Sequence, residues 1–517
     1  MKIARSTTMA WFMTQCIALM VTVPILHVRA AEGAGEPKVR PAAVAGAFYP
    51  ADPQELSKMI DGLLAKATPP AIDGAIVAAV APHAGYPYSG PVAAWTYAAL
   101  KGHKYSRVVL IAPTHYVPFD FTSVFDGDAY TTPLGQVPVD KEFARRLVKM
   151  DATIQLSDKG HQATADAPEH SVEAQLPWLQ KVLGNFELVP IVMGDQSYEA
   201  SRALGVALAK MLRNDHGTLV LASSDLSHYH SYADAETIDH KTLHAIEVYD
   251  YYSLSRNIQW RGPGQPGIWE ACGGAPIVAA MIYAERLGAN QAEVLRYANS
   301  GDITGDKSRV VGYSADLLVK SAHAAGAAAP FSLTGQEKAE LLAIARKSTE
   351  YAVHTGHFYD PPASASETLN REYGAFVTLT EGGMLRGCIG YTSPQKPLYL
   401  TVRDTAAYAA LKDPRFPPVS VGEISQLEYE ISVLSPLRRV TDVDAINVGR
   451  DGLIMKDPGH EGLLLPQVPV EQKWDRQTFL EQTCQKAGME PNCWKDENTD
   501  IFSFTAVVFN EKTGIGK

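Results

Sequence analysis

The chain is poor in cysteine and in basic residues for its length. It has five cysteines in 517 residues, too few for a scaffold built on disulfides. Lys and Arg number 46 against 57 Asp and Glu, giving a formal net charge of −11, and no basic run occurs. This balance excludes a nucleic-acid binder that works by neutralising phosphates. The sequence also lacks an HExxH, a CxxC pair, a P-loop and a GxSxG motif, so the familiar signatures of zinc proteases, phosphate-binding loops and serine hydrolases are missing.

The remaining composition is that of a folded protein. Hydrophobic residues make up 46% and charged residues 20% of the chain, which excludes wholesale disorder. At roughly 150 residues per domain, the length predicts about two to four domains, each large enough to bury a core.

Residues 1–30 have the pattern of a signal peptide. Lys2 and Arg5 precede a largely uncharged apolar stretch, and Val28 and Ala30 supply small residues for a cleavage site. An uncleaved membrane anchor is the alternative interpretation, but the apolar stretch is short for a span and contains Pro24. No later stretch is long and apolar enough to cross a bilayer, so we expect no stable membrane span after processing. We expect an exported, periplasmic protein, and a cytoplasmic one if the signal peptide is misassigned.

An Ala-rich segment at residues 321–332 divides the rest of the chain and is expected to be a linker. Residues 38–320 contain apolar runs separated by turn residues and helical stretches, the pattern of an α/β domain with a mostly parallel sheet flanked by helices. The runs lie at residues 75–81, 108–112, 188–193 and 219–222.

Residues 333–517 mix helices and strands without a regular βαβ order, which predicts an α+β domain. Thr334 and Glu337 form a capping-box pattern ahead of a helix. Residues 374–391 are expected to form a hairpin around Gly382 and Gly383. Cys484 and Cys493 are close enough in sequence to pair in an oxidising compartment, but the sequence alone does not show that they do.

Polar side chains follow three of the predicted strands of the first segment. His83 follows the first run, His115 the second, and Asp225 and His228 the last. Ligand sites in open α/β sheets form outside the carboxyl ends of the strands, so we expect these residues to share a site. A single histidine after a strand is more often structural, whereas histidine or aspartate side chains after three strands favour a ligand-binding site.

Two other segments could lie close to these strand ends. His170 and Glu173 are three residues apart and would share a helical face, although a capped helix start with a solvated acidic turn explains them equally well. Cys272 stands beside Gly273 and Gly274; an unpaired cysteine is usually a small buried hydrophobe, but the glycines allow backbone or ligand to come close to it.

These elements suit a site for one metal ion. Imidazole and thiolate bind iron, zinc or copper, and two histidines with one anionic ligand leave coordination positions open for catalysis. His228 could then act as acid or base, with Asp225 fixing its tautomer. A serine hydrolase built on Ser223, Ser224 and His228 is disfavoured, because triad members usually come from separate loops.

The first segment resembles the Memo family over nearly all of residues 40–320. The motifs that carry the resemblance are RPAAVAGAFYP (40–50), PHAGYPYSG (82–90), PTH (113–115), EHSVEAQLPWL (169–179), SSDLSHY (223–229) and ACGGAP (271–276). The resemblance implies the fold of LigB-type extradiol dioxygenases, which use non-haem iron, with His83, His115 and Cys272 as metal ligands. Cysteine stands where those dioxygenases have a carboxylate, which argues against ordinary ring cleavage. His170, Asp225 and His228 match positions that face the pocket.

The second segment resembles the AMMECR family. Its motifs are LRGCIG (385–390), AAYAALKDPRFPPV (406–419), EYEISVLSP (428–436), VGRDGLIM (448–455) and GLLLPQV (462–468). The chain thus looks like proteins B and A of the AmmeMemoRadiSam system fused together, which implies a radical-SAM protein as a partner. An export signal would separate the chain from such a cytoplasmic partner. Arg386 and Cys388 could hold an anion or carry a reactive thiol, although a tight β structure with a buried cysteine is the favoured reading.

Three functions are therefore compared. The first is a metal-dependent redox enzyme that holds one ion, most simply iron, with copper or zinc as alternatives, and acts on a small molecule or peptide. The second is a peptide-binding adaptor that uses the same cleft without turnover. The third is metal-assisted hydrolysis. The sequence specifies neither the substrate nor the oligomeric state.

Overall fold

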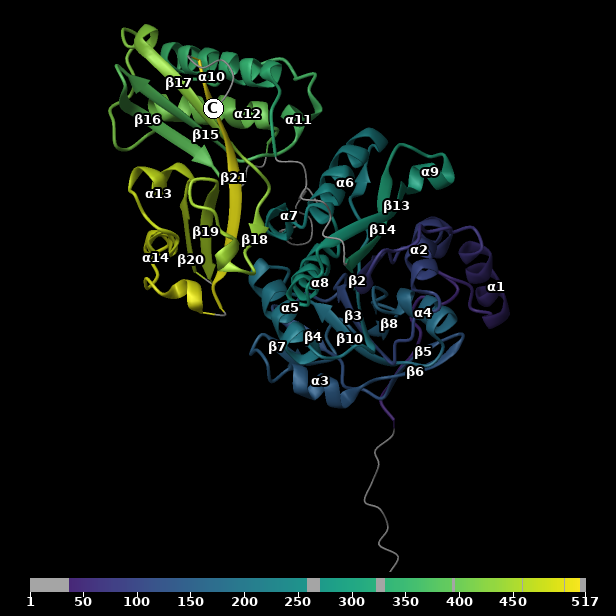
Figure 1. Ribbon diagram of the computed structural model, residues 1–517. Helices are drawn as coiled ribbons and strands as arrows, with labels where there is room; N and C mark the ends of the chain where they lie inside the picture. Colours follow the sequence, from purple (N-terminus) through teal and green to yellow (C-terminus); the bar gives the residue numbers. More distant parts are fainter. Residues whose placement is uncertain are drawn as a thin grey trace, which may run out of the picture. The chain divides into compact units, whose positions relative to one another are not determined.

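The computed structural model describes residues 37–257, 270–321, 331–392, 396–457, 459–496 and 498–511 (Figure 1). The predicted signal peptide and most of the predicted linker lie outside the described residues. Within the described ranges, no helix is both long enough and apolar enough to span a membrane.

Four parallel strands form the centre of the first sheet, in the order β2 (Ala75–Ala81), β11 (Thr218–Ser223), β3 (Arg107–Pro113) and β10 (Glu187–Met193). They correspond to the four apolar runs, so those predictions are confirmed. Successive side chains of a strand enter different cores: Ala78 and Val80 pack in one, and Ala79 and Ala81 in the other. Burial on both faces explains why these strands are continuously apolar.

The edges of this sheet are antiparallel, so the sheet is mixed. The expectation of a mostly parallel sheet holds only for its four central strands. β14 (Val310–Lys320) runs antiparallel to β2, and β13 (Gln291–Asn299) and β12 (His228–His230) pair with β14. On the other side, β4 (Thr122–Val124) is antiparallel to β10 and parallel to β7 (Ile154–Leu156). The connection between β13 and β14 holds only the short α9 (Ser300–Thr304), too little chain for a parallel crossover.

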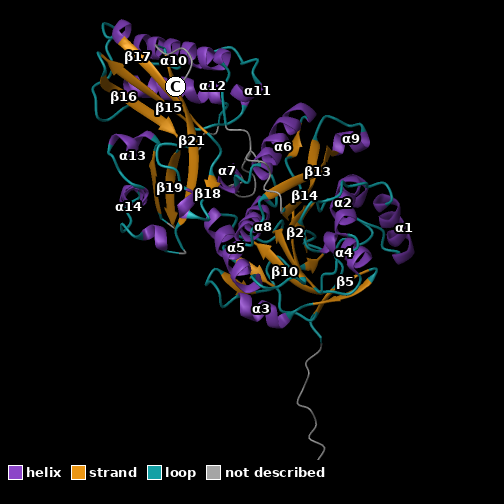
Figure 2. Cartoon of the chain, viewed as in Figure 1, coloured by secondary structure: helices purple, strands orange, loops and turns teal. Residues whose placement is uncertain are grey.

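Helices cover both faces of the first sheet (Figure 2). One face carries the helices that pack in the core of Ala78 and Val80: α3 (Lys141–Leu147), α5 (Tyr198–Leu212), α6 (Tyr232–Glu247), α7 (Tyr251–Asn257) and α8 (Gly274–Arg286). The other face carries α1 (Pro53–Leu64), α2 (Tyr86–Leu100) and α4 (Leu176–Leu183). Two small sheets complete this part: β1 (Val39–Arg40) with β5 (Ala129–Thr132) and β6 (Gly135–Pro138), and β8 (Ala163–Thr164) with β9 (Ala167–Pro168).

The second segment is built on a sheet whose described pairings are all antiparallel. Its order is β16 (Met384–Tyr391), β15 (Ala375–Glu381), β17 (Leu427–Leu434), β21 (Asp500–Asn510), β19 (Asp451–Asp457) and β20 (His460–Leu464), with β18 (Arg438–Arg439) also on β21. The hairpin predicted at residues 374–391 is confirmed as β15 and β16, and Gly382 and Gly383 take the positive φ angles that its tight turn requires.

The helices of the second segment are α10 (Gly335–Thr355), α11 (Glu367–Asn370), α12 (Leu398–Leu411), α13 (Gln467–Glu471) and α14 (Arg476–Lys486). Helix α10 begins with the predicted capping box of Thr334 and Glu337, which is confirmed. Helices α10 and α12 pack on one face of β15 and β17, with Leu341, Val402 and Ile431 fully buried there.

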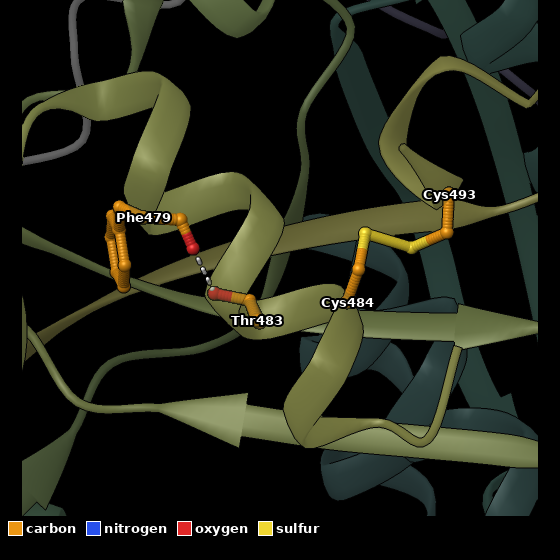
Figure 3. The surroundings of a disulfide bond; sticks show 4 residues. All are labelled: Phe479, Thr483, Cys484 and Cys493. Carbon is orange, nitrogen blue, oxygen red and sulfur yellow. Dashed lines mark hydrogen bonds between the residues drawn. A yellow bond between two sulfur atoms is a disulfide. The ribbon is translucent and has the colours of Figure 1, made fainter. Parts of the chain in front are cut away.

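Cys484 and Cys493 form a disulfide, which settles the pairing that the sequence left open (Figure 3). Cys484 lies on α14, one residue after Thr483, whose hydroxyl donates to the carbonyl of Phe479. Their Cα atoms are 5.8 Å apart, and both cysteines are buried with Phe479 and Leu480. The cross-link therefore ties the end of α14 to the short helix at Cys493–Lys495.

Candidate metal centre

The loops that follow β2 and β3 bring two histidine rings together. His83 and His115 have ring centroids 5.1 Å apart. His170 lies 4.5 Å from His115 and 5.6 Å from His83, also between ring centroids. Because β2 and β3 are parallel, their carboxyl ends share an edge of the sheet, as the sequence predicted.

Cys272 reaches the same place from the turn before α8. Its backbone N–H donates to the carbonyl of Asp225, and its Sγ lies 3.3 Å from Nε2 of His83. Gly273 makes this approach possible, since a Cβ at that position would lie 2.2 Å from the carbonyl oxygen of Ser223. One ligand atom from each of His83, His115 and Cys272 lies within 4.8 Å of the others, which is close enough for one ion.

Glu169 orients His115, a role that the sequence analysis missed. Its carboxylate accepts from the backbone N–H of His115 at 2.6 Å and lies 3.0 Å from Nδ1 of the same ring. It also accepts the backbone N–H groups of His170 and Ser171. Nδ1 therefore carries a proton, and Nε2 is the nitrogen that would face an ion. An acidic residue directly before His170 was the available signal, but its partner lies 54 residues earlier in the chain.

Asp225 and His228 reach the site, but their relationship differs from the expected one. The Oδ1 atom of Asp225 accepts from the backbone N–H groups of His83 and Ala84. The Nδ1 atom of His228 lies 2.8 Å from the carbonyl oxygen of Leu226. A carbonyl can only accept, so Leu226 and not Asp225 sets the tautomer of His228, and Nε2 is the free nitrogen. Ligand atoms of Asp225, His228 and Cys272 also lie within 4.8 Å of one another.

His170 belongs to the cluster, whereas Glu173 does not. The ring of His170 stacks on His115 at an interplanar angle of 19° and lies 4.5 Å from the ring of Phe48. Its Nδ1 atom is buried and has no hydrogen-bond partner among the described residues. This nitrogen lies 4.0 Å from Oε1 of Glu169, beyond hydrogen-bond distance, in a cluster of potential metal ligands.

Glu173 is a structural residue. Its carboxylate is fully buried and accepts from the side chain of Arg40, the hydroxyl of Tyr49, and the backbone N–H groups of Ala43 and Val44. Neither interpretation of this pair holds: the helix begins only at Glu173, so His170 precedes it, and the carboxylate is buried and not solvated.

Burial dominates the electrostatics of the site. Burial lowers the pKa of His83 well below its usual value, and the neighbouring His115 and His170 lower it further. Burial likewise lowers the pKa of His228 to about 4. Neutral imidazoles are the form that binds metal, so His83 and His228 need no deprotonation near neutral pH.

By contrast, the pKa values of His115 and Cys272 are raised. Burial lowers the pKa of His115, but the Glu169 carboxylate outweighs burial and raises that pKa well above its usual value. Burial also raises the pKa of the Cys272 thiol, and that of Asp225 to about 6. Both side chains would therefore have to lose a proton before they could hold a metal ion.

The LRGCIG motif of the second segment is held by packing and ion pairing. A Cβ on Gly387 would lie 2.1 Å from the carbonyl oxygen of Ala409, so only glycine lets β16 approach α12 this closely. The guanidinium of Arg386 pairs with Glu423 at 2.7 Å. Cys388 is a free, half-buried cysteine whose sulfur accepts from the hydroxyl of Thr378. These contacts agree with the tight β structure favoured from the sequence, but Cys388 is only partly buried and not buried as expected.

Comparison with known proteins assigns both segments. Residues 40–317 match a family described as Memo-like protein, and residues 342–509 match AMMECR1. The MEMO1 family protein MK0963 of Methanopyrus kandleri is 37% identical over 286 residues, covering 53% of this chain and 97% of that protein. A protein of Thermococcus onnurineus is 43% identical over 182 residues, covering 33% of this chain and 89% of that protein.

Two solved structures are similar to parts of the chain. The crystal structure of the uncharacterized protein PH0010 from Pyrococcus horikoshii covers 33% of this chain and 90% of its own, with 43% identity and a TM-score of 0.32. That of the uncharacterized protein JW3007 from Escherichia coli covers 41% and 86%, with 14% identity and a TM-score of 0.28. From the family matches and the identities with its relatives, the chain belongs to the Memo-like family through residues 40–317 and carries an AMMECR1 domain in tandem at residues 342–509.

Proposed function

We propose that the Memo-like domain is a metal-dependent redox protein that holds one ion between His83, His115 and Cys272. The observation that carries the proposal is the meeting of two imidazoles and one thiol, from three separate loops, within 4.8 Å. Two nitrogens and one sulfur suit iron, copper or zinc, and three protein ligands leave positions open. Iron is the ion implied by the resemblance to LigB-type dioxygenases.

The surroundings of the cluster support a site open on one side. The side chain of His83 is 1% exposed, whereas that of His115 is 25% exposed, so solvent reaches the cluster from the His115 side. Tyr116, next in the chain, is 44% exposed and lies 6.2 Å from the ring of His170. A small molecule or the side chain of a peptide would enter there.

The protein groups beside the three ligands would handle protons. When bound, an iron ion would polarise a ligand in its open positions and exchange electrons with it. His228 presents Nε2 as a neutral base, because Nδ1 is held by the Leu226 carbonyl. His170 offers a second neutral imidazole, since burial lowers its pKa to about 4.

Metal titration tests the ligand assignment. We expect the wild-type protein to bind one Co²⁺ per chain under anaerobic conditions, with cobalt–thiolate absorption. Cys272→Ser should lose this absorption and most of the affinity, because a hydroxyl is a poor replacement for thiolate. His228→Ala should keep the metal and lose any activity. Unchanged occupancy in Cys272→Ser would refute the assignment, and loss of metal in His228→Ala would make His228 a ligand.

The metal content of the native protein and its binding of peptides separate the other functions. Tight zinc in the native protein would favour hydrolysis, and peptide binding that survives His83→Ala without metal would favour an adaptor.

We also propose that the chain is exported. The disulfide between Cys484 and Cys493 supports this, because such bonds persist mainly in oxidising compartments.

A further inference from the structure

A chain of buried polar side chains leads to His83 from the side away from Cys272. Its members are Tyr97, Gln175 and Ser223, each fully buried. A buried hydrogen-bond network of this kind fixes where each proton lies, because each group has a limited set of donors and acceptors.

The orientation of the Gln175 amide is determined by backbone carbonyls. Its Nε2 atom lies 3.1 Å from the carbonyl oxygens of both Ala81 and Pro82, at the end of β2. Carbonyls only accept, so the NH₂ group must face them. Its Oε1 atom, on the other side, accepts from the hydroxyl of Tyr97. If the amide were reversed, its oxygen would face the two carbonyl oxygens, and neither hydrogen bond could form.

The single proton of the Ser223 hydroxyl is then assigned. Its Oγ lies 2.6 Å from the carbonyl oxygen of Ser171, which can only accept, so Ser223 donates there. Gln175 Nε2 lies 2.7 Å from the same Oγ, so its two amide hydrogens are shared among this oxygen and the two carbonyls. Ser223 therefore has no proton left for Nδ1 of His83, which lies 2.9 Å away. That contact requires Nδ1 of His83 to be the donor.

We propose that Gln175 and Ser223 are positioning residues that hold His83 in its Nδ1-protonated tautomer before any metal arrives. The lone pair is then on Nε2, the nitrogen that lies 3.3 Å from Cys272 Sγ. This role extends the proposed function and rests on it in one respect: Nε2 of His83 is the atom that would bind the metal. The relay itself is neutral, whereas the carboxylate nearest to His83, Oδ2 of Asp225, lies 3.8 Å from Nε2 on the other side of the ring.

The tautomer can be measured in the metal-free protein. Full-length protein labelled with ¹⁵N-histidine would be studied by solid-state NMR, with the His83 signals identified by their loss in His83→Gln. We expect a protonated Nδ1 and an unprotonated Nε2 in the wild type. In Ser223→Ala, we expect a mixture of the two tautomers.

Anaerobic Co²⁺ titration provides the second readout. Ser223→Ala should bind about 10–100-fold more weakly, the usual cost of losing a partner that orients a metal-bound histidine. Thr96→Val is the matched control, because it removes another fully buried hydroxyl that donates to a carbonyl, that of Val80 on β2. It should leave both the tautomer and the affinity unchanged.

The outcomes separate the two proposals. A protonated Nε2 in the wild type would overturn the inference, whether or not metal binds, and so would Ser223→Ala with an unchanged tautomer and affinity. If the tautomer is as expected and shifts in Ser223→Ala, but the wild type binds no metal, the relay stands and the proposed function alone fails.

Discussion

Replacing Glu169 by glutamine should weaken both the fold and the proposed metal site. The Glu169 carboxylate is 2% exposed and takes four N–H groups: Oε2 takes the backbone N–H of His115, and Oε1 takes the His115 ring and the N–H groups of His170 and Ser171. Glutamine has one carbonyl oxygen and an NH₂ group. If the oxygen takes the position of Oε1, the NH₂ group faces the backbone N–H of His115.

The magnitude follows from these contacts. Leaving one buried donor unsatisfied costs about 1–3 kcal/mol. Turning the other three bonds from charge-assisted to neutral adds about 1–2 kcal/mol, since bonds to charged groups are the stronger ones. We therefore expect Glu169→Gln to lower the free energy of unfolding by about 3 kcal/mol in the metal-free protein.

This loss should depend on pH. The Glu169 carboxyl is buried, which raises its pKa, but His115 and the N–H bonds outweigh burial, and the net pKa is lowered. Its stabilisation is thus present above the ordinary carboxyl value and is lost as the pH falls through the lowered one. The pKa of His115 is raised, so its contribution is complete below about 6.5 and is lost as the pH rises through the raised value. The difference between wild type and Glu169→Gln should be largest near pH 5–6 and smaller in strong acid or base.

Urea unfolding of the metal-free protein at several pH values measures this difference, and Co²⁺ titration measures the effect on the site. We expect Glu169→Gln to bind the metal at least 10-fold more weakly, because His115 loses its orienting partner. Equal stability and equal affinity in wild type and variant would refute the argument.

Three other changes separate structural roles from the metal site. Glu173→Gln should destabilise the fold by about 3 kcal/mol by breaking its buried pair with Arg40, while metal affinity stays unchanged; a large loss of affinity would contradict its structural role. Replacing both Cys484 and Cys493 by alanine should cost the AMMECR1 domain about 2–4 kcal/mol in thermal or urea unfolding, and an unchanged midpoint would count against the cross-link. Gly387→Ala should lower the free energy of unfolding by about 1–3 kcal/mol, because its Cβ would meet the carbonyl oxygen of Ala409. Gly422→Ala is the control, because nothing lies within 4 Å of a Cβ at that position. Equal effects of the two substitutions would disprove the packing explanation.

The sequence predicted the parts of the fold that depend on local pattern. The four central strands are continuously apolar because both of their faces are buried, and the hairpin at Gly382 and Gly383 follows from the φ angles that its turn needs. The antiparallel edges were missed, because β13 and β14 carry no local signal for the direction in which they pair.

The candidate site, too, was predicted only in part from the sequence. His83 and His115 could be placed together because parallel strands end at one edge. Cys272 follows no strand of the central sheet; its residue type and the adjacent glycines made it a candidate, and the family resemblance implied its role as a ligand. Glu169 and Ser223 act on residues 54 and 140 positions away, and a single sequence does not reveal such pairs.

Two role assignments failed for specific physical reasons. Asp225 was expected to orient His228, but the Leu226 carbonyl is closer along the chain and takes that bond. One of two interpretations placed Glu173 on a helical face with His170, but the chain becomes helical only at Glu173, and its carboxylate pairs with Arg40 in the core.

The central claim is that His83, His115 and Cys272 hold one transition-metal ion. Elemental analysis of the protein purified from its native compartment, beside Cys272→Ser purified in the same way, tests this most directly. We predict close to one iron per wild-type chain and a large loss in the variant. Wild-type protein without a transition metal, or equal metal content in the two proteins, would contradict the claim.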